Sequence, residues 1–241
     1  MALIEEQIKT GNWLFKHRSY LPVVLFILYY IGLIQDVKSI HLFQNDTWLI
    51  ICFLVSLLGQ LIRIITVAKV PMDTSGRNTK KQKAGSINKL GIYSILRHPL
   101  YLGNYFMWLG MFLLIPILWV HIIFSLMYWL YYERIMIAEE EFLRGKFGNE
   151  YTDWAEGVSA FIPSFKNYKK NAQSINFKNI IKREYTSFSA MIILFIVLIN
   201  INNWLYLENW NVGYSSKLSL LIIIIFYVVM RLLKKKTTIF K

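Results

Sequence analysis

The stretch that decides the fold is WLIICFLVSLLGQLIRIITV, residues 48–67. Only Gln60 and Arg63 interrupt its apolar character. An α-helix rises about 1.5 Å per residue, so about 20 apolar residues cross the hydrocarbon core of a bilayer. The length and composition of this stretch therefore predict a transmembrane helix.

Five further stretches have the same apolar character, although some of them are shorter. Pro116 separates two of them, and this arrangement predicts a tight helical hairpin. Together with the first stretch they predict about six membrane spans. The five stretches are residues 21–34, 100–115, 117–132, 188–207 and 218–233.

The composition of the chain excludes an ordinary soluble domain. Of the 241 residues, 56% are hydrophobic and 17% are charged, whereas a soluble domain has roughly 45–50% and about 25%. Cys52 is the only cysteine, which excludes a disulfide scaffold. We therefore predict an all-α fold, a polytopic membrane helical bundle.

The net charge of +13 is distributed unevenly between the connections. Basic residues gather at both termini and in the connections 68–99 and 133–187. The only basic residues in the other three connections are Lys38 and Lys217. This alternation follows the positive-inside rule, predicts that both termini face the cytoplasm, and accounts for the charge without a nucleic-acid partner. The abundance of Lys, Ile and Asn favours a bacterial inner membrane as the location.

A first polar motif, GIYSILRHPLYLG (residues 91–103), lies where the third span begins. Pro99 suits the first turn of a helix, where a missing N–H group is no loss. Arg97 and His98 then lie just before the helix N-terminus, whose free N–H groups and dipole favour an anion. The motif predicts an anion-binding position at the membrane surface.

A second motif, EEEFLRGKFGNEYTDW (residues 139–154), follows the fourth span. Glu139 falls on the same helical face as a stripe of apolar side chains. A carboxylate just beyond a span is costly unless it meets a cation or a donor, so Glu139 is a candidate functional residue. The apolar stripe predicts one continuous helix, and its members are Leu143, Phe147, Tyr151 and Trp154.

Together the two motifs resemble those of a known superfamily. The pattern G-x-Y-x-x-x-R-H-P-x-Y-x-G is followed by E-E-x-x-L-x-x-x-F-G-x-x-Y and then by Ile162-Pro163. This joint pattern is similar to that of the isoprenylcysteine carboxyl methyltransferase and phospholipid methyltransferase superfamily. The resemblance suggests three parts: an N-terminal transmembrane hairpin (1–75), a methyltransferase core (76–165) and a C-terminal extension with two transmembrane helices (166–241).

The resemblance implies an S-adenosylmethionine-dependent methyltransferase, with a cofactor pocket that faces the cytoplasm and no metal. The acceptor would be a lipid or lipidated molecule that reaches the site from the bilayer. Candidate catalytic residues are Arg97, Arg134 and Glu140. Residues expected to line the cofactor pocket are Tyr93, His98, Pro99, Leu100 and Tyr101, with Glu139 opposite. Backbone contacts are expected from Gly85, Ser86, Ile87 and Asn88.

The charge of the acceptor decides what the site has to provide. A carboxylate or phosphate acceptor is already ionised and needs only a cation such as Arg97 or Arg134 beside it. An amine acceptor would first have to lose a proton. In the isoprenylcysteine enzymes an arginine lies four residues before this glutamate, whereas here Ile135 holds that place, with Arg134 next to it.

Two other functions fit part of the pattern. An NADPH-dependent sterol-type reductase has a similar R-H-P and Tyr pattern, but it carries Lys-Tyr-Gly where this chain has Lys146-Phe147-Gly148. A membrane scaffold would keep the fold without the reaction. A scaffold, unlike either enzyme, would bind no cofactor.

Plain structural roles also exist for several of these residues. His98 would cap the third span, and Arg63 would extend its side chain toward the membrane surface, as interfacial arginines often do. Gly103 and Gly110 are seven residues apart and would allow close contact between helices.

Overall fold

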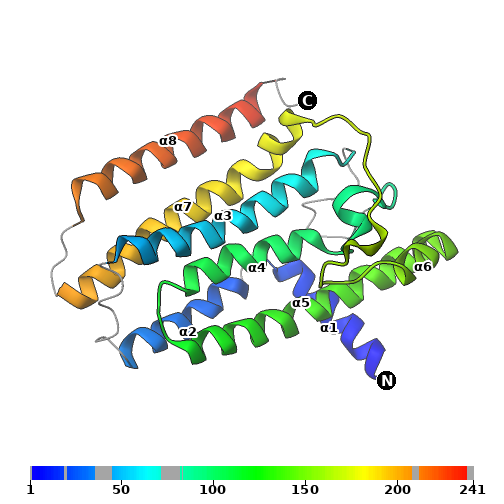
Figure 1. The fold of residues 1–241 in the computed structure, drawn as a ribbon, viewed down its shortest axis with the longest axis horizontal. Helices are drawn as coiled ribbons and strands as arrows, with labels where there is room; N and C mark the ends of the chain where they lie inside the picture. The colour runs from blue at the N-terminus through cyan, green and yellow to red at the C-terminus, as the bar shows by residue number, and fades with distance from the viewer. Residues whose placement is uncertain are drawn as a thin grey trace.

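The computed structural model describes residues 2–18, 21–35, 45–71, 82, 84–207 and 212–237. All regular elements within these ranges are helices, which confirms the predicted all-α fold. Figure 1 shows them in an elongated bundle. The α-helices are α1 (Leu3–His17), α2 (Leu21–Gln35), α3 (Asp46–Ala68), α4 (Pro99–Phe112), α5 (Leu118–Phe147), α6 (Asn149–Glu156), α7 (Phe177–Leu207) and α8 (Tyr214–Lys236). Two short 3-10 helices are η2 (Gly91–Ser94) and η3 (Phe165–Asn167).

Each predicted span lies within or largely within one helix of this bundle. By length and composition, α3, α7 and α8 can cross a membrane, and α2 contains a shorter apolar helix, Val24–Gln35. The hairpin around Pro116 joins α4 and α5, which confirms the predicted turn. Helix α4, with 14 residues, is shorter than the about 20 that a full span needs. The structure is that of a membrane helical bundle.

Two helix boundaries differ from those that the apolar pattern predicts. Helix α5 continues from the fourth span without a break as far as Phe147. The chain then turns at Gly148, whose φ of 54° is a conformation that glycine adopts readily, and α6 begins. The prediction of one helix through Trp154 is therefore wrong, because periodicity continues across a turn that a single glycine introduces.

Helices α3 and α4 approach closely through small residues. A side chain at Gly59 would collide with the Gly103 carbonyl, and one at Gly110 would collide with Ser56. The Ser56 hydroxyl donates a hydrogen bond to the Met107 carbonyl across this contact, at 2.7 Å. Close packing at Gly103 and Gly110 is thus confirmed, and it holds α4, which follows the RHP motif, against α3.

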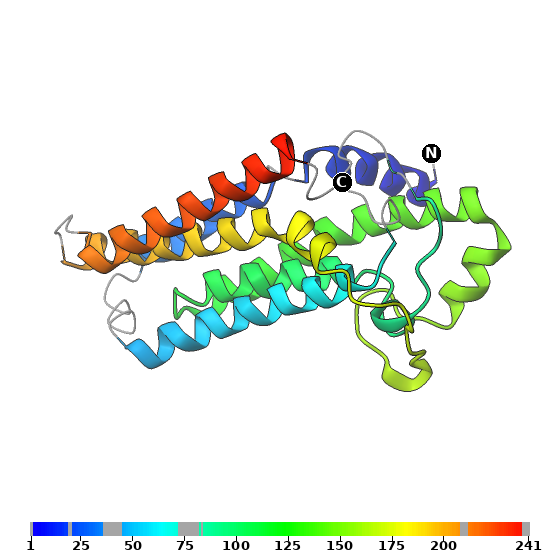
Figure 2. The same cartoon turned by 90° about the horizontal axis from the view of Figure 1, so that it is seen from above.

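Arg63 points into the bundle and does not extend to the surface. Its guanidinium donates to both carboxylate oxygens of Glu184 on α7, at 2.8 and 2.9 Å. The interpretation of Arg63 as an interfacial anchor is wrong, because a buried partner from the C-terminal part of the chain was available. Figure 2 shows α7 beside α3 from a second direction.

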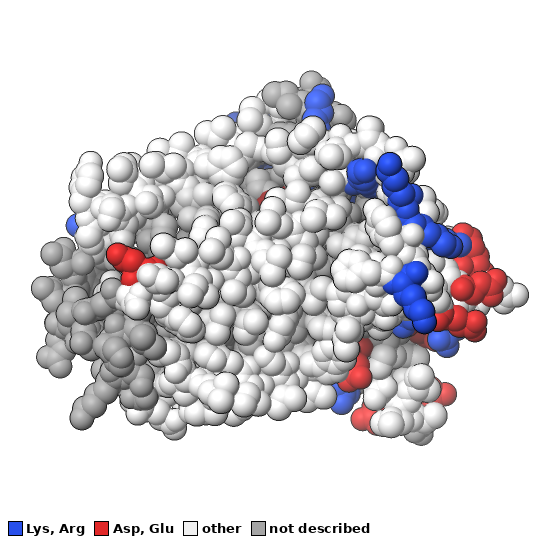
Figure 3. All heavy atoms as spheres, viewed as in Figure 1, with Lys and Arg blue, Asp and Glu red and all other residues white. Residues whose placement is uncertain are grey.

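Charged side chains concentrate at one end of the molecule. In Figure 3, most of the blue and red atoms lie at the right-hand end, and the broad middle of this face is uncharged. The right-hand end contains α6 and the loops that flank it (Figure 1). A wide uncharged surface with a charged end suits a bundle whose sides meet lipid and whose end meets water.

Candidate active site at the start of α4

The RHP segment is held in place by its backbone. The N–H groups of Arg97 and His98 donate to the carbonyls of Ser159 and Ala160, at 2.8 and 3.2 Å. Helix α4 then begins at Pro99, as the motif predicted. The loop that follows α6 therefore lies directly against the start of α4, although the two are far apart in sequence.

His98 does not act as a side-chain cap of α4. It occupies the cap position, but its side chain makes no capping hydrogen bond. Its Nε2 atom instead lies 2.8 Å from Oε1 of Glu140 on α5, and the imidazole is 8% exposed. The plain structural interpretation of His98 is therefore wrong, and the histidine links the two motifs.

Arg97 contacts the same carboxylate, and each nitrogen of its guanidinium donates at least one hydrogen bond. Its Nε and Nη2 atoms donate to the two oxygens of Glu140, at 2.9 and 3.3 Å. Its Nη1 atom donates to the carbonyls of Ala155 and Val158, both at 2.7 Å. A planar guanidinium bound at each nitrogen has a defined orientation, so Arg97 is a preorganised cation.

Glu139 lies on the other side of the imidazole. Its Oε2 atom is 3.7 Å from Nδ1 of His98, and its Oε1 atom is 3.9 Å from the guanidinium of Arg18, which follows α1. The Tyr101 ring stacks on the His98 ring with centroids 5.8 Å apart. His98 therefore stands between two neighbouring glutamates.

The surroundings shift the pKa values of the Glu139 and Glu140 carboxyl groups in opposite directions. Both lie on the part of α5 beyond the predicted span. Burial raises the pKa of Glu139, and His98, Tyr101 and Arg18 only partly offset this effect. Burial also disfavours the charged form of Glu140, but the hydrogen bond and charge of His98, together with Arg97, outweigh it and lower the pKa of that carboxyl. Glu140 is thus the more readily ionised of the pair.

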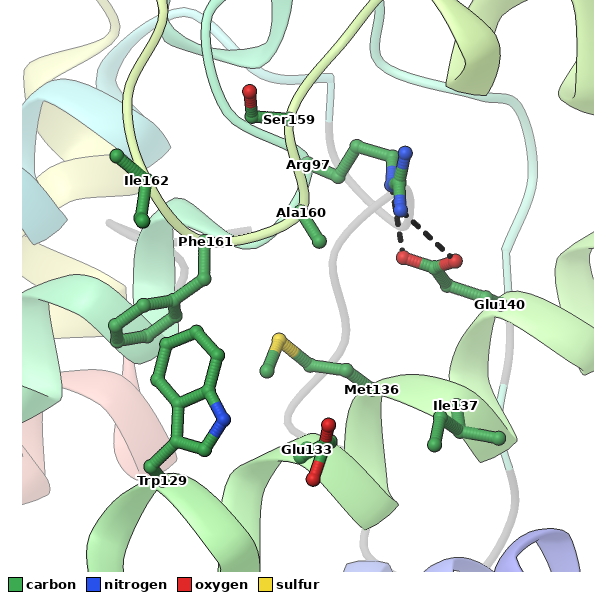
Figure 4. A pocket seen from close by; sticks show the side chains of 10 residues that line it. All are labelled: Arg97, Trp129, Glu133, Met136, Ile137, Glu140, Ser159, Ala160, Phe161 and Ile162. Carbon is green, nitrogen blue, oxygen red and sulfur yellow. Dashed lines mark hydrogen bonds and ion pairs between the residues drawn. The ribbon is translucent and has the colours of Figure 1, made fainter. Parts of the chain in front are cut away.

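A pocket of about 440 Å³ lies beside the Arg97–Glu140 pair. One wall is a stripe along α5, and the opposite wall is the loop after α6. Figure 4 shows Arg97 reaching from the loop side toward Glu140, with Trp129 and Phe161 together at the other end. The lining residues are Arg97, Trp129, Glu133, Met136, Ile137, Glu140, Ser159, Ala160, Phe161 and Ile162.

The structure brings some of the predicted site residues to this pocket and not others. Arg97 and Glu140 line it, and His98 contacts Glu140 from the neighbouring side. Arg134 is not among the lining residues, and its carbonyl faces Gly11 of α1. The expected cofactor-lining residues outside this pocket are Tyr93, His98, Pro99, Leu100, Tyr101 and Glu139.

The segment expected to contribute backbone contacts lies near the end of α5. Its neighbour Ala84 accepts a hydrogen bond from the Lys146 side chain, and Lys89 pairs with Glu150 at 3.0 Å. Gly85 and Ser86 are exposed, whereas Ile87 and Asn88 are half-buried.

Sequence reasoning missed the α5 wall of the pocket. Trp129, Glu133 and Met136 are spaced by four and three residues, and Glu140 follows Met136 by four. This helical spacing places them on one face and leads directly to the acidic pair. The signal was present, but it was overlooked because it crosses the end of the predicted fourth span, with Trp129 inside that span and Glu133 and Met136 beyond it.

Comparisons with known proteins agree with the motifs. Residues 47–150 match the family described as phospholipid methyltransferase. A protein-S-isoprenylcysteine O-methyltransferase of Saccharomyces cerevisiae is 35% identical over 120 residues, which are 46% of this chain and 47% of the relative. The enzyme of the same name from Tribolium castaneum is 28% identical over 139 residues, 55% of this chain and 46% of the relative. That from Schizosaccharomyces pombe is 33% identical over 108 residues, 44% of this chain and 45% of the relative.

The similarity to these relatives covers only part of each protein. The chain spans about half the length of the curated relatives it matches. All three are eukaryotic, so they lend no support to a bacterial membrane. No solved structure matches the chain significantly. The matched residues 47–150 contain Arg97-His98-Pro99 and Glu139-Glu140, the two motifs that carry the resemblance to the isoprenylcysteine carboxyl methyltransferase and phospholipid methyltransferase superfamily.

Proposed function

We propose that this protein is an integral membrane methyltransferase that uses S-adenosylmethionine and methylates a lipid or lipidated acceptor at a carboxylate or phosphate. The observation that carries the proposal is the contact of Arg97 and His98 with Glu140 beside a pocket. This contact joins the two motifs that the superfamily resemblance depends on.

The residues around the pocket fit the proposed cofactor. Its volume of about 440 Å³ lies in the usual range for small-molecule sites, roughly 300–1,000 Å³. S-adenosylmethionine supplies a methyl group on a sulfonium, together with an ammonium and a carboxylate. The wall offers the cation Arg97, the carboxylates Glu133 and Glu140, and aromatic faces. These groups complement both signs of charge.

Arg97 is the residue best placed to stabilise an anionic acceptor. Its charge lies on the pocket wall, and its hydrogen bonds to Glu140 and two carbonyls hold its orientation. A preorganised cation lowers the energy of an anionic reactant without reorganising during the reaction. Arg134 stays a candidate only for an acceptor that reaches a different face of α5.

The apolar end of the pocket supports an acceptor with a hydrocarbon chain. Trp129, Phe161 and Ile162 form this end, and the Ile162 side chain is 74% exposed. The names of the three relatives refer to O-methylation of isoprenylcysteine. An isoprenylated thioether carboxylate therefore agrees with both the wall and the relatives, and we propose the cytoplasmic leaflet as its source.

Methyl transfer from labelled S-adenosylmethionine tests the proposal. The purified protein in lipid nanodiscs would be given an S-farnesyl cysteine carboxylate, an anionic phospholipid or an ethanolamine phospholipid. We expect label in one of the two anionic acceptors. Label in the amine lipid alone would overturn the anionic acceptor, and the absence of donor binding would overturn the methyltransferase.

The same preparation separates the rival functions. Heat released with NADPH but not with S-adenosylmethionine in calorimetry would favour the reductase. Under the scaffold hypothesis the wild-type protein binds no donor at all, and Glu140→Gln changes nothing. Under our proposal Glu140→Gln, at a residue that lines the pocket, weakens donor binding by about 1.5–3 kcal/mol, as for a lost hydrogen bond to a charged group.

A further inference from the structure

Glu133 is one of the two carboxylates on the pocket wall, and the proposed function assigns it no ligand group of its own. It lies on α5 and is half-buried. Figure 4 shows it on the helix between Trp129 and Ile137, at the edge of the pocket. No hydrogen bond or ion pair joins it to another residue in the part of the chain that the structure describes. A partly desolvated carboxylate is costly unless a cation meets it.

The cation lining the pocket is not available to Glu133. Three nitrogens of Arg97 donate to Glu140 and to two backbone carbonyls. Two carboxylates therefore share the wall with one guanidinium, which is already bound to Glu140. The ionised side chains of the lining therefore sum to one negative charge, and the carboxylate without a paired cation is Glu133.

Aromatic rings complete the surroundings of this carboxylate. Trp129 and Phe161 pack edge to face, with ring centroids 4.5 Å apart and planes at 89°. Both rings line the pocket that Glu133 lines. Aromatic faces attract organic cations, including ammonium and sulfonium groups. A carboxylate beside such rings recognises an organic cation better than a metal ion or an anion.

We propose that Glu133, Trp129 and Phe161 form a subsite for an organic cation, next to the Arg97–Glu140 pair. One source of that cation is the sulfonium of S-adenosylmethionine, and this case rests on the proposed function. The other source is the ammonium headgroup of an amine phospholipid. The shared chemistry is a positively charged alkylated nitrogen or sulfur.

Calorimetry with two related ligands tests the first source. S-adenosylmethionine carries the sulfonium, whereas S-adenosylhomocysteine has a neutral thioether and the same ammonium and carboxylate. In Glu133→Gln we expect affinity for S-adenosylmethionine to fall about tenfold, as for a lost charge-assisted contact. Affinity for S-adenosylhomocysteine should be unchanged. The control is Glu141→Gln on the same helix, whose side chain is 45% exposed and pairs with Arg144.

The second source is tested with a soluble headgroup, glycerophosphoethanolamine, and with glycerophosphoglycerol, which keeps the phosphate but has hydroxyl groups in place of the ammonium. Weaker binding of the amine alone in Glu133→Gln would support a lipid ammonium. Unchanged binding of every ligand, or an equal loss for the ligands with and without the sulfonium or lipid ammonium, would overturn the subsite. Trp129→Leu should reproduce the selective loss, and the thermal unfolding midpoint of each variant monitors its folding. If the wild type binds no S-adenosylmethionine, the proposed function fails while the amine comparison still tests the subsite.

Discussion

The guanidinium of Arg63 forms a two-pronged ion pair with the carboxylate of Glu184, with N–O distances of 2.8 and 2.9 Å. Gln60 and Ser187 donate to the same carboxylate, whose side chain is 5% exposed. Arg63 also donates to Asn104 of α4. Arg63 lies within the segment that matches the family, and Glu184 lies outside it. Helix α7 is thereby tied to the two helices that support the RHP motif.

Removing Glu184 should destabilise the bundle strongly. In Glu184→Ala the buried Arg63 charge loses its partner, and breaking a buried pair costs about 3–5 kcal/mol. Chemical unfolding in detergent would measure the change. The matched control is Glu141→Ala, which breaks an exposed pair with Arg144 and should cost less than about 1 kcal/mol. Similar losses in both variants would contradict a buried role for Glu184.

Arg97 should tolerate replacement by lysine much less well than Arg134 does. Lysine keeps the charge but cannot reach Glu140 and two carbonyls with a planar fork. We expect Arg97→Lys to lower methyl transfer by about tenfold or more, whereas Arg134→Lys has a small effect. Initial rates at saturating donor would measure both. A larger loss in Arg134→Lys would show that the acceptor lies on another face of α5.

Glu140 should make the protein lose stability in acid. Its pKa in the folded protein lies below its ordinary value of 4.5, so its ionised form stabilises the folded state above that pH. The contribution disappears as the pH falls from 4.5 through the lowered pKa. The thermal midpoint of Glu140→Gln should therefore fall less steeply with acid than that of the wild type.

The contribution of Glu139 to stability should depend on pH in the opposite sense to that of Glu140, so the two variants serve as controls for each other. Its pKa is raised above 4.5, so its contribution is complete below that pH and is lost as the pH rises through the raised pKa. The midpoint of Glu139→Gln should decline less than that of the wild type over this higher range. The same sign for both variants would contradict the opposed environments of the two carboxyls.

Gly110 should not accept a side chain. A Cβ there would collide with the Cys52 carbonyl and the Ser56 hydroxyl on α3. We expect Gly110→Ala to cost about 1–3 kcal/mol through overpacking. Gly145→Ala, where no atom lies within 4 Å of the new carbon, should instead stabilise α5 by up to about 1 kcal/mol. Unfolding midpoints compare the two, and a neutral Gly110→Ala would contradict the close approach of α3 and α4.

A cysteine at position 82 should be labelled from the cytoplasmic side. The natural Cys52 is buried with no exposed area, so it gives little background. A membrane-impermeant maleimide added to sealed vesicles should react with Gln82→Cys only when the cytoplasmic face is outward. Reaction from the opposite face would overturn the proposed orientation. The neighbouring Lys80 and Lys81 lie outside the described residues.

The helices themselves could be predicted from the amino-acid pattern. In lipid, backbone groups must find partners within their own segment, so long apolar runs such as residues 48–67 form helices. The RHP and acidic motifs also predicted which polar residues would meet near the membrane surface. The contacts of Arg97 and His98 with Glu140 agree with that expectation.

Contacts between distant segments required the tertiary structure. Arg63 and Glu184 are 121 positions apart, and nothing in either neighbourhood indicates the other. The pocket likewise combines the α5 stripe around Glu133 with the loop at Phe161, whose backbone is aligned by hydrogen bonds to the RHP segment. Local hydrogen bonding and hydrophobicity specify helices residue by residue. The partner of a buried charge and the shape of a pocket depend instead on how those helices pack, and no short stretch of the chain contains that information.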